Sequence, residues 1–441
     1  MKPLQVGLAG IGTVGSGVWQ VLTRNQDEIQ RRAGRPIRIS AVADLDQARA
    51  KALAGDSAQV LGNAFCLAED PAIDVIVELI GGYGVAKELV LKAISSGKHV
   101  VTANKALLAV HGNEIFAAAR EHGVMVAFEA AVAGGIPIIK ALREGLTANR
   151  IEWIAGIING TTNFILSEMR DKGLSFDTAL KEAQKLGYAE ADPTFDIEGI
   201  DAAHKATILA SIAFGIPMQF EKAYVEGITK LQSEDIRYAE QLGYRIKLLG
   251  ITKRRFEAGQ LKGIELRVHP TLIPAKRLIA NVEGAMNAVW VKGDAVGHTM
   301  YYGKGAGSEP TASAVIADLV DVARMLATDP MNRVPHLAFQ ADAFSDVAVL
   351  PMDQVQTAYY LRLKVADEPG VLADITRILA DGRISIDAVL QREPAEGENQ
   401  TDIVLLTHQT LEGHLRAAVS RIEALPTVLS KVILIRLEEL N

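Results

Sequence analysis

Residues 4–15, with the sequence LQVGLAGIGTVG, decide how the N-terminal part of the chain folds. The apolar run 4–10 is typical of a buried strand, and the glycines after it precede an amphipathic stretch that reaches about Asn25. Only glycine lets the backbone turn tightly enough to approach a pyrophosphate, which then binds at the helix N-terminus. The stretch therefore predicts a dinucleotide-binding loop. The loop residues that we expect to contact the cofactor are Gly10, Gly12, Thr13, Val14 and Gly15.

Further apolar runs alternate with helical stretches after this loop. These runs are IRISAVAD, which ends at Asp44, DVIVELIGG at 74–82, HVVTAN at 99–104 and VMVAFEAAVAGG at 124–135. Strands that alternate with helices predict a parallel sheet with right-handed crossovers. We therefore expect a doubly wound nucleotide domain over residues 1–135, which a long helix within about 303–330 completes.

Asp44 ends the second predicted strand, about 30 residues after the glycine loop, where an acid can bind the adenosine ribose. An acid at this place disfavours the 2′-phosphate of NADP. Arg49 lies nearby in the sequence and can bind a phosphate, although an exposed arginine is usually only solvated. The sequence therefore makes NAD plausible and leaves NADP open.

Three charged residues are candidates for the chemistry. Lys105 follows a strand end, and that edge of an open α/β sheet faces the ligand crevice, although a plain surface lysine fits its position equally well. Asp201 and Lys205 are four residues apart in GIDAAHKATILA, a helix that is apolar almost all round. The alternative for this pair is a solvent-exposed ion pair of little consequence. A buried lysine beside a carboxylate instead suits proton transfer.

The pattern changes after Pro137. A strand-like run at 151–159 precedes helical stretches at about 162–172, 175–186 and 199–214, so we expect a mixed α/β catalytic and dimerisation domain over 136–302. Residues 331–355 are interpreted as a linker. Residues 356–441 follow the order strand, helix, strand, strand, helix, strand, which is the ferredoxin-like plan. We expect this tail to fold as an independent layer that leaves the catalytic part complete without it.

Composition excludes several classes of protein. The net charge of −7 gives no basic surface for nucleic acid or for an anionic membrane. Cys66 is the only cysteine, so neither an internal disulfide nor a site with several thiolate ligands is possible. No apolar run reaches the ~20 residues of a spanning helix, and no secretory signal pattern is present. The reducing cytoplasm is the expected location.

Several segments together resemble the homoserine dehydrogenases. They are GLAGIGTVGSGV in the N-terminal loop, VTANKALL after the strand at 99–104, NGTTNFIL at 159–166, AQKLGYAEADPTFDIEGIDAAHK at 183–205 and GKGAGSEPTASAV at 303–315. The resemblance runs from residue 1 to about 330. It implies a reversible NAD(P)-dependent reduction of L-aspartate 4-semialdehyde to L-homoserine, in threonine and methionine biosynthesis.

The resemblance also implies roles for particular residues. Lys205 would donate and accept the proton at the substrate oxygen, while Asp201 and Glu190 would bind substrate and orient that lysine. Lys105 would contact substrate or nicotinamide. The further cofactor contacts would be Thr102 and Gly307. Many relatives carry a basic residue beside the acid that ends the second strand, whereas Ala43 stands here, which puts the family's common NADP preference in doubt.

A monovalent cation site is a second implication of the resemblance. Its ligands would be Glu129 and the backbone carbonyls of Val132, Gly134 and Ile136, and the ion would be Na⁺ or K⁺. Carbonyl-rich coordination suits a weakly charged hard ion, whereas a transition metal would need His or Cys ligands.

The tail resembles an ACT domain, most clearly in DEPGVL at 367–372. The glycine at its strand-to-helix turn, Gly370, lets an amino-acid ligand approach backbone amides. The resemblance implies threonine as a feedback ligand, and an inert dimerisation module is the alternative. We expect a homodimer or a homotetramer.

Two other functions compete with this hypothesis. A semialdehyde dehydrogenase that works through a thiohemiacetal needs a cysteine nucleophile, and Cys66 lies in a segment with no adjacent base. A non-catalytic amino-acid sensor would use both domains for binding alone. The Asp201–Lys205 pair argues against this sensor, because burying charges without a function is costly.

Overall fold

The computed structural model describes residues 2–392 and 397–441. The chain divides into two compact units. The first unit comprises Met1–Gly160, Asp201–Glu221 and Ala285–Val347, and the second comprises Thr161–Ile200, Lys222–Gly284 and Ala348–Asn441.

A parallel sheet forms the centre of the first unit, with the strand order β3-β2-β1-β4-β5-β6. Its strands are β1 (Leu4–Ala9), β2 (Ile37–Ala43), β3 (Gln59–Leu61), β4 (Val75–Glu78), β5 (His99–Thr102) and β6 (Val126–Ala127). The order reverses between β1 and β4, and ligands of such sheets bind where this reversal occurs, at the carboxyl ends of the strands. The predicted doubly wound, Rossmann-type fold is confirmed.

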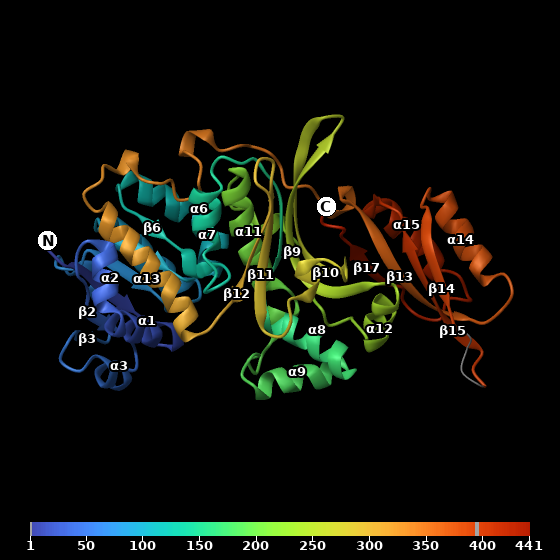
Figure 1. Cartoon of the computed structure of the whole chain (residues 1–441), viewed down its shortest axis with the longest axis horizontal. Coiled ribbons are helices and arrows are strands. Elements are labelled where there is room, and N and C mark those ends of the chain that lie inside the picture. The colour runs from blue at the N-terminus through green and yellow to red at the C-terminus, as the bar shows by residue number, and fades with distance from the viewer. Residues whose placement is uncertain (1, 393–396) are drawn as a thin grey trace. The chain divides into compact units, whose positions relative to one another are not determined.

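Helices cover this sheet. They are α1 (Thr13–Arg24), α2 (Gln26–Ala33), α3 (Gln47–Ala54), α4 (Phe65–Glu69), α5 (Gly84–Ser95), α6 (Lys105–Glu121) and α13 (Ser308–Met325). Helix α13 lies beside α1 and α2 (Figure 1), and its buried Val315, Leu319 and Val322 share one apolar core with β1. A helix within 303–330 therefore belongs to the nucleotide-binding fold, as predicted.

The run at 124–135 is mostly not a strand. Only β6 pairs with the sheet, and Glu129–Ala131 then form a single 3₁₀ turn. The reason is local, because the backbone N–H of Glu129 donates to the Asp318 carboxylate of α13 instead of to a neighbouring strand.

The rest of the first unit carries the buried helix α11 (Ile200–Phe214), whose residues from Asp201 onward are all inaccessible to solvent or nearly so. Strands β7 (Ile151–Ile157), β11 (Met286–Gly293) and β12 (Gly297–Lys304) pair antiparallel in the order β12-β11-β7. The short helix α7 (Ile138–Lys140) follows the 3₁₀ turn.

The second unit contains a long antiparallel hairpin of β9 (Tyr244–Glu257) and β10 (Gln260–Pro274), with β8 (Tyr224–Val225) parallel to β10. No sequence pattern described above predicts this hairpin. Outside the tail, the helices of this unit are α8 (Gly160–Lys172), α9 (Phe176–Lys185), α10 (Thr194–Ile197) and α12 (Ser233–Gln241). The predicted helices at 162–172, 175–186 and 199–214 agree with α8, α9 and α11 to within two residues.

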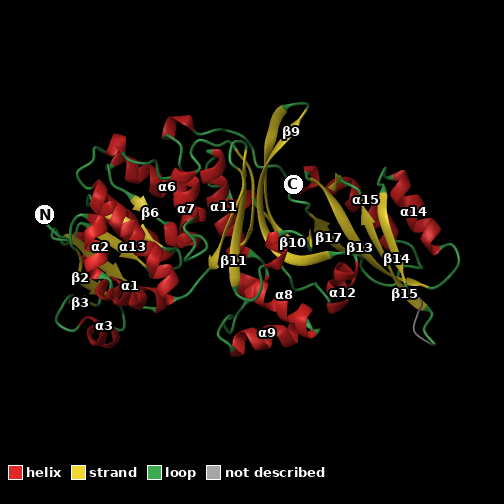
Figure 2. Ribbon diagram, viewed as in Figure 1, coloured by secondary structure: helices red, strands yellow, loops and turns green. Residues whose placement is uncertain are grey.

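The tail folds as predicted, with the strand order β17-β13-β15-β14. Its elements are β13 (Gln356–Ala366), α14 (Val371–Asp381), β14 (Ile386–Gln391), β15 (Gln400–Thr407), β16 (Thr410–Leu411), α15 (Glu412–Glu423) and β17 (Ile433–Leu437). Alternate residues of β13, such as Tyr359 and Leu361, share a core with both helices. Figure 2 shows these helices beside the strands of the tail.

The tail is not a separate layer, which differs from the expectation. Strand β17 pairs in parallel with β10, with Thr271 opposite Arg436. The fully buried Arg267 of β10 binds Glu438, which follows β17, at 2.5 Å. The segment 331–355 contains only short 3₁₀ turns, yet the N–H of Leu350 donates to the carbonyl of Ile264 in β10. The hairpin and the tail therefore form one hydrogen-bonded body.

Within residues 2–392 and 397–441, no helix is long and apolar enough to cross a membrane. The same residues hold no group of three or more His, Cys, Asp or Glu side chains arranged around a possible metal ion. The thiol-bearing residue Cys66 is exposed.

Candidate active site

Helix α11 brings two of the predicted residues together. Asp201 and Lys205 lie one turn apart, and Lys205 Nζ is 2.7 Å from Asp201 Oδ2. The same Nζ donates to the carbonyl oxygen of Ile158, also at 2.7 Å. Both side chains are at least nine-tenths buried. Because the helix is buried and the Lys205 Nζ donates to two acceptors, the pair is held in one arrangement.

A strand end supplies the third charged residue. Asn104 caps α6, since its Oδ1 accepts from the N–H of Leu107 and its Nδ2 donates to the carbonyl of Gly82. Lys105 is therefore the first residue of this helix, and its Nζ lies 3.2 Å from Asp201 Oδ1. About a third of the Lys105 side chain is exposed, so this ammonium group faces solvent as well as the carboxylate.

The electrostatics of the site keep the Asp201 carboxylate ionised. Burial acts to raise the pKa of the Asp201 carboxyl, but the charges of Lys205 and Lys105 hold that pKa well below its ordinary value. Burial also lowers the pKa of His204 to about 4, and its ring packs on Phe220 with the ring centroids 4.3 Å apart. The imidazole is thus neutral at neutral pH. One carboxylate between two ammonium groups leaves the site with net positive charge.

Asn159 is a residue of this site that the sequence analysis did not assign. It follows β7, and its Nδ2 donates to Asp201 Oδ2 at 2.9 Å. Asp201 Oδ2 therefore accepts from both Asn159 and Lys205, which fixes the carboxylate plane. The segment NGTTNFIL contained the signal, but its first residue received no role.

The glycine loop has the shape that a dinucleotide requires. A side chain on Gly15 would meet the Gly10 carbonyl oxygen at 2.1 Å, so the turn closes on itself. A Cβ on Gly12 would meet no atom within 4 Å, so the loop presents open space outside this residue. Asp44 Oδ2 accepts from the N–H of Ile11 at 2.6 Å, which ties the end of β2 to the loop. These residues fit a pyrophosphate and a ribose, as the sequence predicts.

Glu78 is a second residue that the sequence analysis missed. It ends β4 with no exposed surface, and its Oε1 accepts from the N–H groups of Ile80 and Gly81. Its Oε2 accepts the hydroxyl proton of Thr102 at 2.6 Å. The Thr102 side chain is itself fully buried, so it holds the β4 and β5 ends together and presents no hydroxyl to a cofactor.

Gly307 precedes α13 and lies next to the glycine loop. The Ser308 hydroxyl donates to the carbonyl of Thr13 at 2.8 Å, and a Cβ on Gly17 would come within 2.5 Å of that hydroxyl. Gly307 itself has a φ of 124°, which favours glycine. The segment at 303–315 and the loop after β1 therefore form one surface.

The proposed cation ligands lie in one turn of the first unit. Glu129 is buried, and its two carboxylate oxygens accept the N–H groups of Ile139 and Lys140 at 2.9 and 2.8 Å. Burial raises the pKa of Glu129. The carbonyl of Ile136 accepts from the N–H of Ile138. Gly134 adopts a φ of 48°, so the backbone turns sharply between the predicted ligands.

Glu190 belongs to the second unit, where it is exposed in the loop between α9 and α10. Its carbonyl accepts from the Gln184 side chain at 3.1 Å. The substrate role of its carboxylate stays a prediction.

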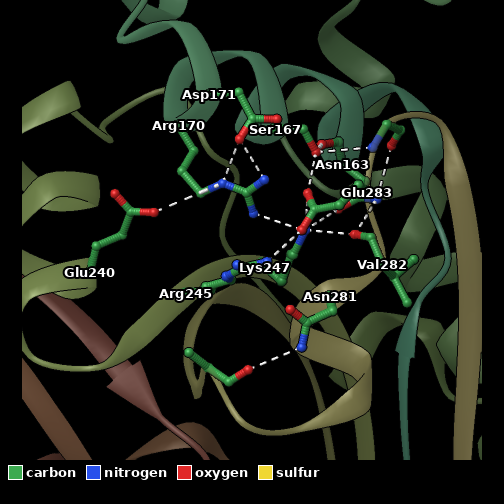
Figure 3. A network of polar contacts seen from close by, with 12 residues as sticks. Asn163, Ser167, Arg170, Asp171, Glu240, Arg245, Lys247, Asn281, Val282 and Glu283 are labelled. Carbon is green, nitrogen blue, oxygen red and sulfur yellow. Dashed lines mark hydrogen bonds and ion pairs between the residues drawn. The ribbon is translucent and has the colours of Figure 1, made fainter.

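The second unit also holds a polar cluster around Glu283 (Figure 3). Glu283 binds Arg170 and Arg245 at 2.6 and 2.8 Å, and it binds the buried Lys247 at 3.2 Å. Lys247 also donates to Asn163 and to the Val282 carbonyl. Burial lowers the pKa of Lys247 to about 8. These contacts fasten α8 and β9 to the segment before β11, and no substrate role follows from them.

Comparison with known families agrees with this geometry. Residues 10–129 match the NAD-binding domain of homoserine dehydrogenase, residues 137–320 match the homoserine dehydrogenase family, and residues 359–427 match the ACT domain. A hyperthermophilic archaeal homoserine dehydrogenase, solved in complex with NADPH, is 27% identical with a TM-score of 0.62 and covers 74% of this chain. The alignment covers 99% of the archaeal chain.

Several relatives match over the full length of the chain. The homoserine dehydrogenase of Pseudomonas aeruginosa is 62% identical over 441 residues, which is all of both chains. The crystal structure of a homoserine dehydrogenase from Thiobacillus denitrificans is 68% identical with a TM-score of 0.95, and the alignment covers 100% of this chain and 99% of that one. The chain described here therefore belongs to the homoserine dehydrogenases, NAD(P)-dependent oxidoreductases, and carries a C-terminal ACT domain.

Proposed function

We propose that Lys205 is the acid–base group of the homoserine dehydrogenase reaction and that Asp201 orients it. The observation that supports this is the position of one buried carboxylate, Asp201, between the ammonium groups of Lys205 and Lys105. Lys205 Nζ donates hydrogen bonds to Asp201 and to the Ile158 carbonyl. These two bonds fix the position of Nζ and therefore the direction in which its remaining N–H bond points.

The reduction would proceed as follows. When bound, the nicotinamide would supply a hydride to C4 of L-aspartate 4-semialdehyde. Lys205 donates a proton to the aldehyde oxygen as negative charge develops there, which gives the hydroxyl of L-homoserine. In the oxidative direction Lys205 takes that proton back. The positive charge of Lys105 stabilises the developing alkoxide or holds the substrate carboxylate, and Glu190 would bind the substrate.

Asp201→Asn tests this orientation. The amide keeps the size of the side chain but removes the charge that holds two lysines, so turnover should fall by about 10²-fold. Binding of NADPH, followed by its fluorescence, should stay within about threefold of wild type, since Asp201 does not lie in the glycine loop. Unchanged turnover would remove Asp201 from the mechanism.

We further propose that the enzyme uses NAD at least as well as NADP, with the cofactor bound by the glycine loop and Asp44 at the adenosine ribose. Support comes from the Asp44 carboxylate at the end of β2 and from its neighbour Ala43, which carries no positive charge for a 2′-phosphate.

The turn at 129–136 is proposed to bind Na⁺ or K⁺ through Glu129 and the carbonyls of Val132, Gly134 and Ile136. The raised pKa of Glu129 supports this, because a buried carboxylate gains from a nearby cation. Activity measured in KCl, NaCl and choline chloride at one ionic strength tests it. Equal rates in all three salts would contradict a cation requirement.

We also propose that threonine inhibits the enzyme by binding to the ACT domain. Gly370 has a φ of 99° and precedes α14, and a Cβ there would meet no atom within 4 Å. The turn is therefore open to a small ligand. Full-length enzyme that is indifferent to millimolar threonine would contradict this proposal and would favour a dimerisation role.

A further inference from the structure

A cavity of about 440 Å³ in the first unit takes no part in the reaction described above. Its walls come from the C-terminal end of α6, the residues around β6, the turn at 141–145 and the end of α13 on one side. The segment 330–344 forms the other side. Cavities of roughly 300–1,000 Å³ are the size that small ligands occupy, and protein interiors rarely leave such space unfilled.

Apolar and aromatic groups make up much of the lining. The ring of His336 stacks on Phe116 with the centroids 5.4 Å apart and the planes at 28°. Its Nε2 accepts from the N–H of Val126 at 3.1 Å, so the ring serves as an acceptor there and is uncharged. Val124, Leu337 and Phe339 complete this side. The aromatic floor suits a hydrophobic ligand body.

The guanidinium groups of arginines that line the cavity carry its positive charge. Arg120, Arg143 and Arg333 all line it, and their charges together help to keep the pKa of His336 near 4, after burial. Arg143 is paired with Glu144 at 2.9 Å. Arg333 instead donates to the backbone carbonyls of Thr328 and Gly123. A carbonyl does not neutralise a guanidinium, so this charge persists.

Arg120 is exposed, and no carboxylate of the described chain lies within 4.0 Å of its guanidinium. The remaining arginine of the lining, Arg324, donates to the carbonyl of Arg32 and lies 3.5 Å from Asp321. Asp342 also lines the cavity, from the segment 330–344. The lining thus offers two guanidinium groups, those of Arg120 and Arg333, that form no hydrogen bond to a carboxylate of the described residues, although Asp329 acts electrostatically on Arg333.

We propose that this cavity binds a small carboxylate with an apolar body. The carboxylate would lie at Arg120 and Arg333, because a guanidinium binds a carboxylate through two parallel hydrogen bonds. The apolar body would lie on the Phe116 and His336 rings. A phosphate ester fits less well, since its second charge and its polar body would face an apolar wall.

Isothermal titration of the full-length chain with 3-phenylpropanoate tests this, with the uncharged 3-phenylpropan-1-ol as the matched probe. The acid should bind with a dissociation constant below about 1 mM, and the alcohol should bind about tenfold more weakly. Arg120→Gln should weaken binding of the acid by about 3- to 10-fold and leave the alcohol unchanged. Arg38→Gln, at an exposed arginine of β2, should change neither.

A second variant tests the location. Val334 lines the cavity and is 38% exposed. Val334→Trp can therefore fill the cavity without replacing a buried residue, and it should abolish binding of the acid. Three results would overturn the proposal. These are no saturable binding up to about 10 mM acid, equal binding of acid and alcohol, or competition between the acid and homoserine. The last result would place the acid in the active site.

Discussion

The Nε atom of Arg362 in β13 lies 2.6 Å from Oδ1 of Asp235 in α12, and both side chains are buried. The Nη2 atom of Arg362 binds the second oxygen of the same carboxylate at 3.0 Å, so the contact is bidentate. Removing one partner of such a pair typically costs 3–5 kcal/mol, because the other charge then stays buried and unpaired. The ACT domain thus supplies a charge that the rest of the second unit needs.

A chain that ends at Ser345 should therefore lose stability and activity. It would leave Asp235 and Arg267 without their partners in the tail and would expose the edge of β10. Soluble yield, circular dichroism and turnover of the truncated chain measure this. Arg362→Met in the full chain isolates one ion pair and should destabilise it by about 3 kcal/mol. A truncated chain with wild-type turnover would show that the tail is dispensable.

Cofactor preference should depend on residues 44 and 45. Wild type should use NAD at least as well as NADP in the oxidative direction. Ala43 is only 2% exposed, whereas Leu45 is 94% exposed, so an arginine is tolerated at 45 and not at 43. Asp44→Ser with Leu45→Arg should shift the ratio of kcat/KM values toward NADP by about tenfold or more. A strong NADP preference of wild type would show that the role given to Asp44 is wrong.

Glu78→Gln should weaken both the fold and cofactor binding. The glutamine keeps one acceptor oxygen, so it can serve either Ile80 and Gly81 or Thr102 but not both sets of donors, as the two carboxylate oxygens do. Stability should fall by about 1–3 kcal/mol, and KM for the cofactor should rise while kcat changes little. Glu88→Gln, on the exposed side of α5, is the matched control. Equal melting temperature and KM in both variants would exclude this role.

The loss of folding stability at acid pH should depend on Glu283. Burial acts to raise its pKa, but Arg170 and Lys247 lower it to about 2, below the ordinary value of 4.5. Because the folded pKa is the lower one, the stabilisation is complete above about pH 4.5 and is lost as the pH falls toward 2. About a third of the Glu283 side chain is exposed, so solvent screening should reduce the effect to about 1–2 kcal/mol. Urea unfolding between pH 7 and 3.5 should show a shallower decline for Glu283→Gln than for wild type, and parallel curves would contradict this.

The sequence was sufficient where one local pattern determines the structure. Gly10, Gly12 and Gly15 required the turn, and the alternation of strands and helices required the parallel sheet. The sequence was insufficient where contacts between residues far apart in the chain determine the local structure. The run at 124–135 is as apolar as a strand, yet Glu129 bonds to Asp318, a residue 189 positions away. The attachment of the tail to β10 depends on Arg267 and Glu438, which no sequence pattern pairs.

The same distinction applies to the residues of the active site. Asp201 and Lys205 are one helical turn apart, so their contact is local and was predictable. Lys105 and Asn159 reach the same carboxylate from a strand end and from the residue after β7, and only the tertiary fold brings them there. Glu78 gave no signal in the sequence, because a buried glutamate at a strand end is recognised only by its partners.

The turnover of Lys205→Ala tests the central claim most directly, because the claim assigns the proton transfer to this one ammonium group. The variant should keep its circular dichroism spectrum and its cofactor binding, while kcat for homoserine oxidation falls by about 10²–10⁴-fold. Lys181→Ala, at an exposed lysine of α9, should match wild type. A folded Lys205→Ala enzyme whose kcat stays within about threefold of wild type would contradict the account.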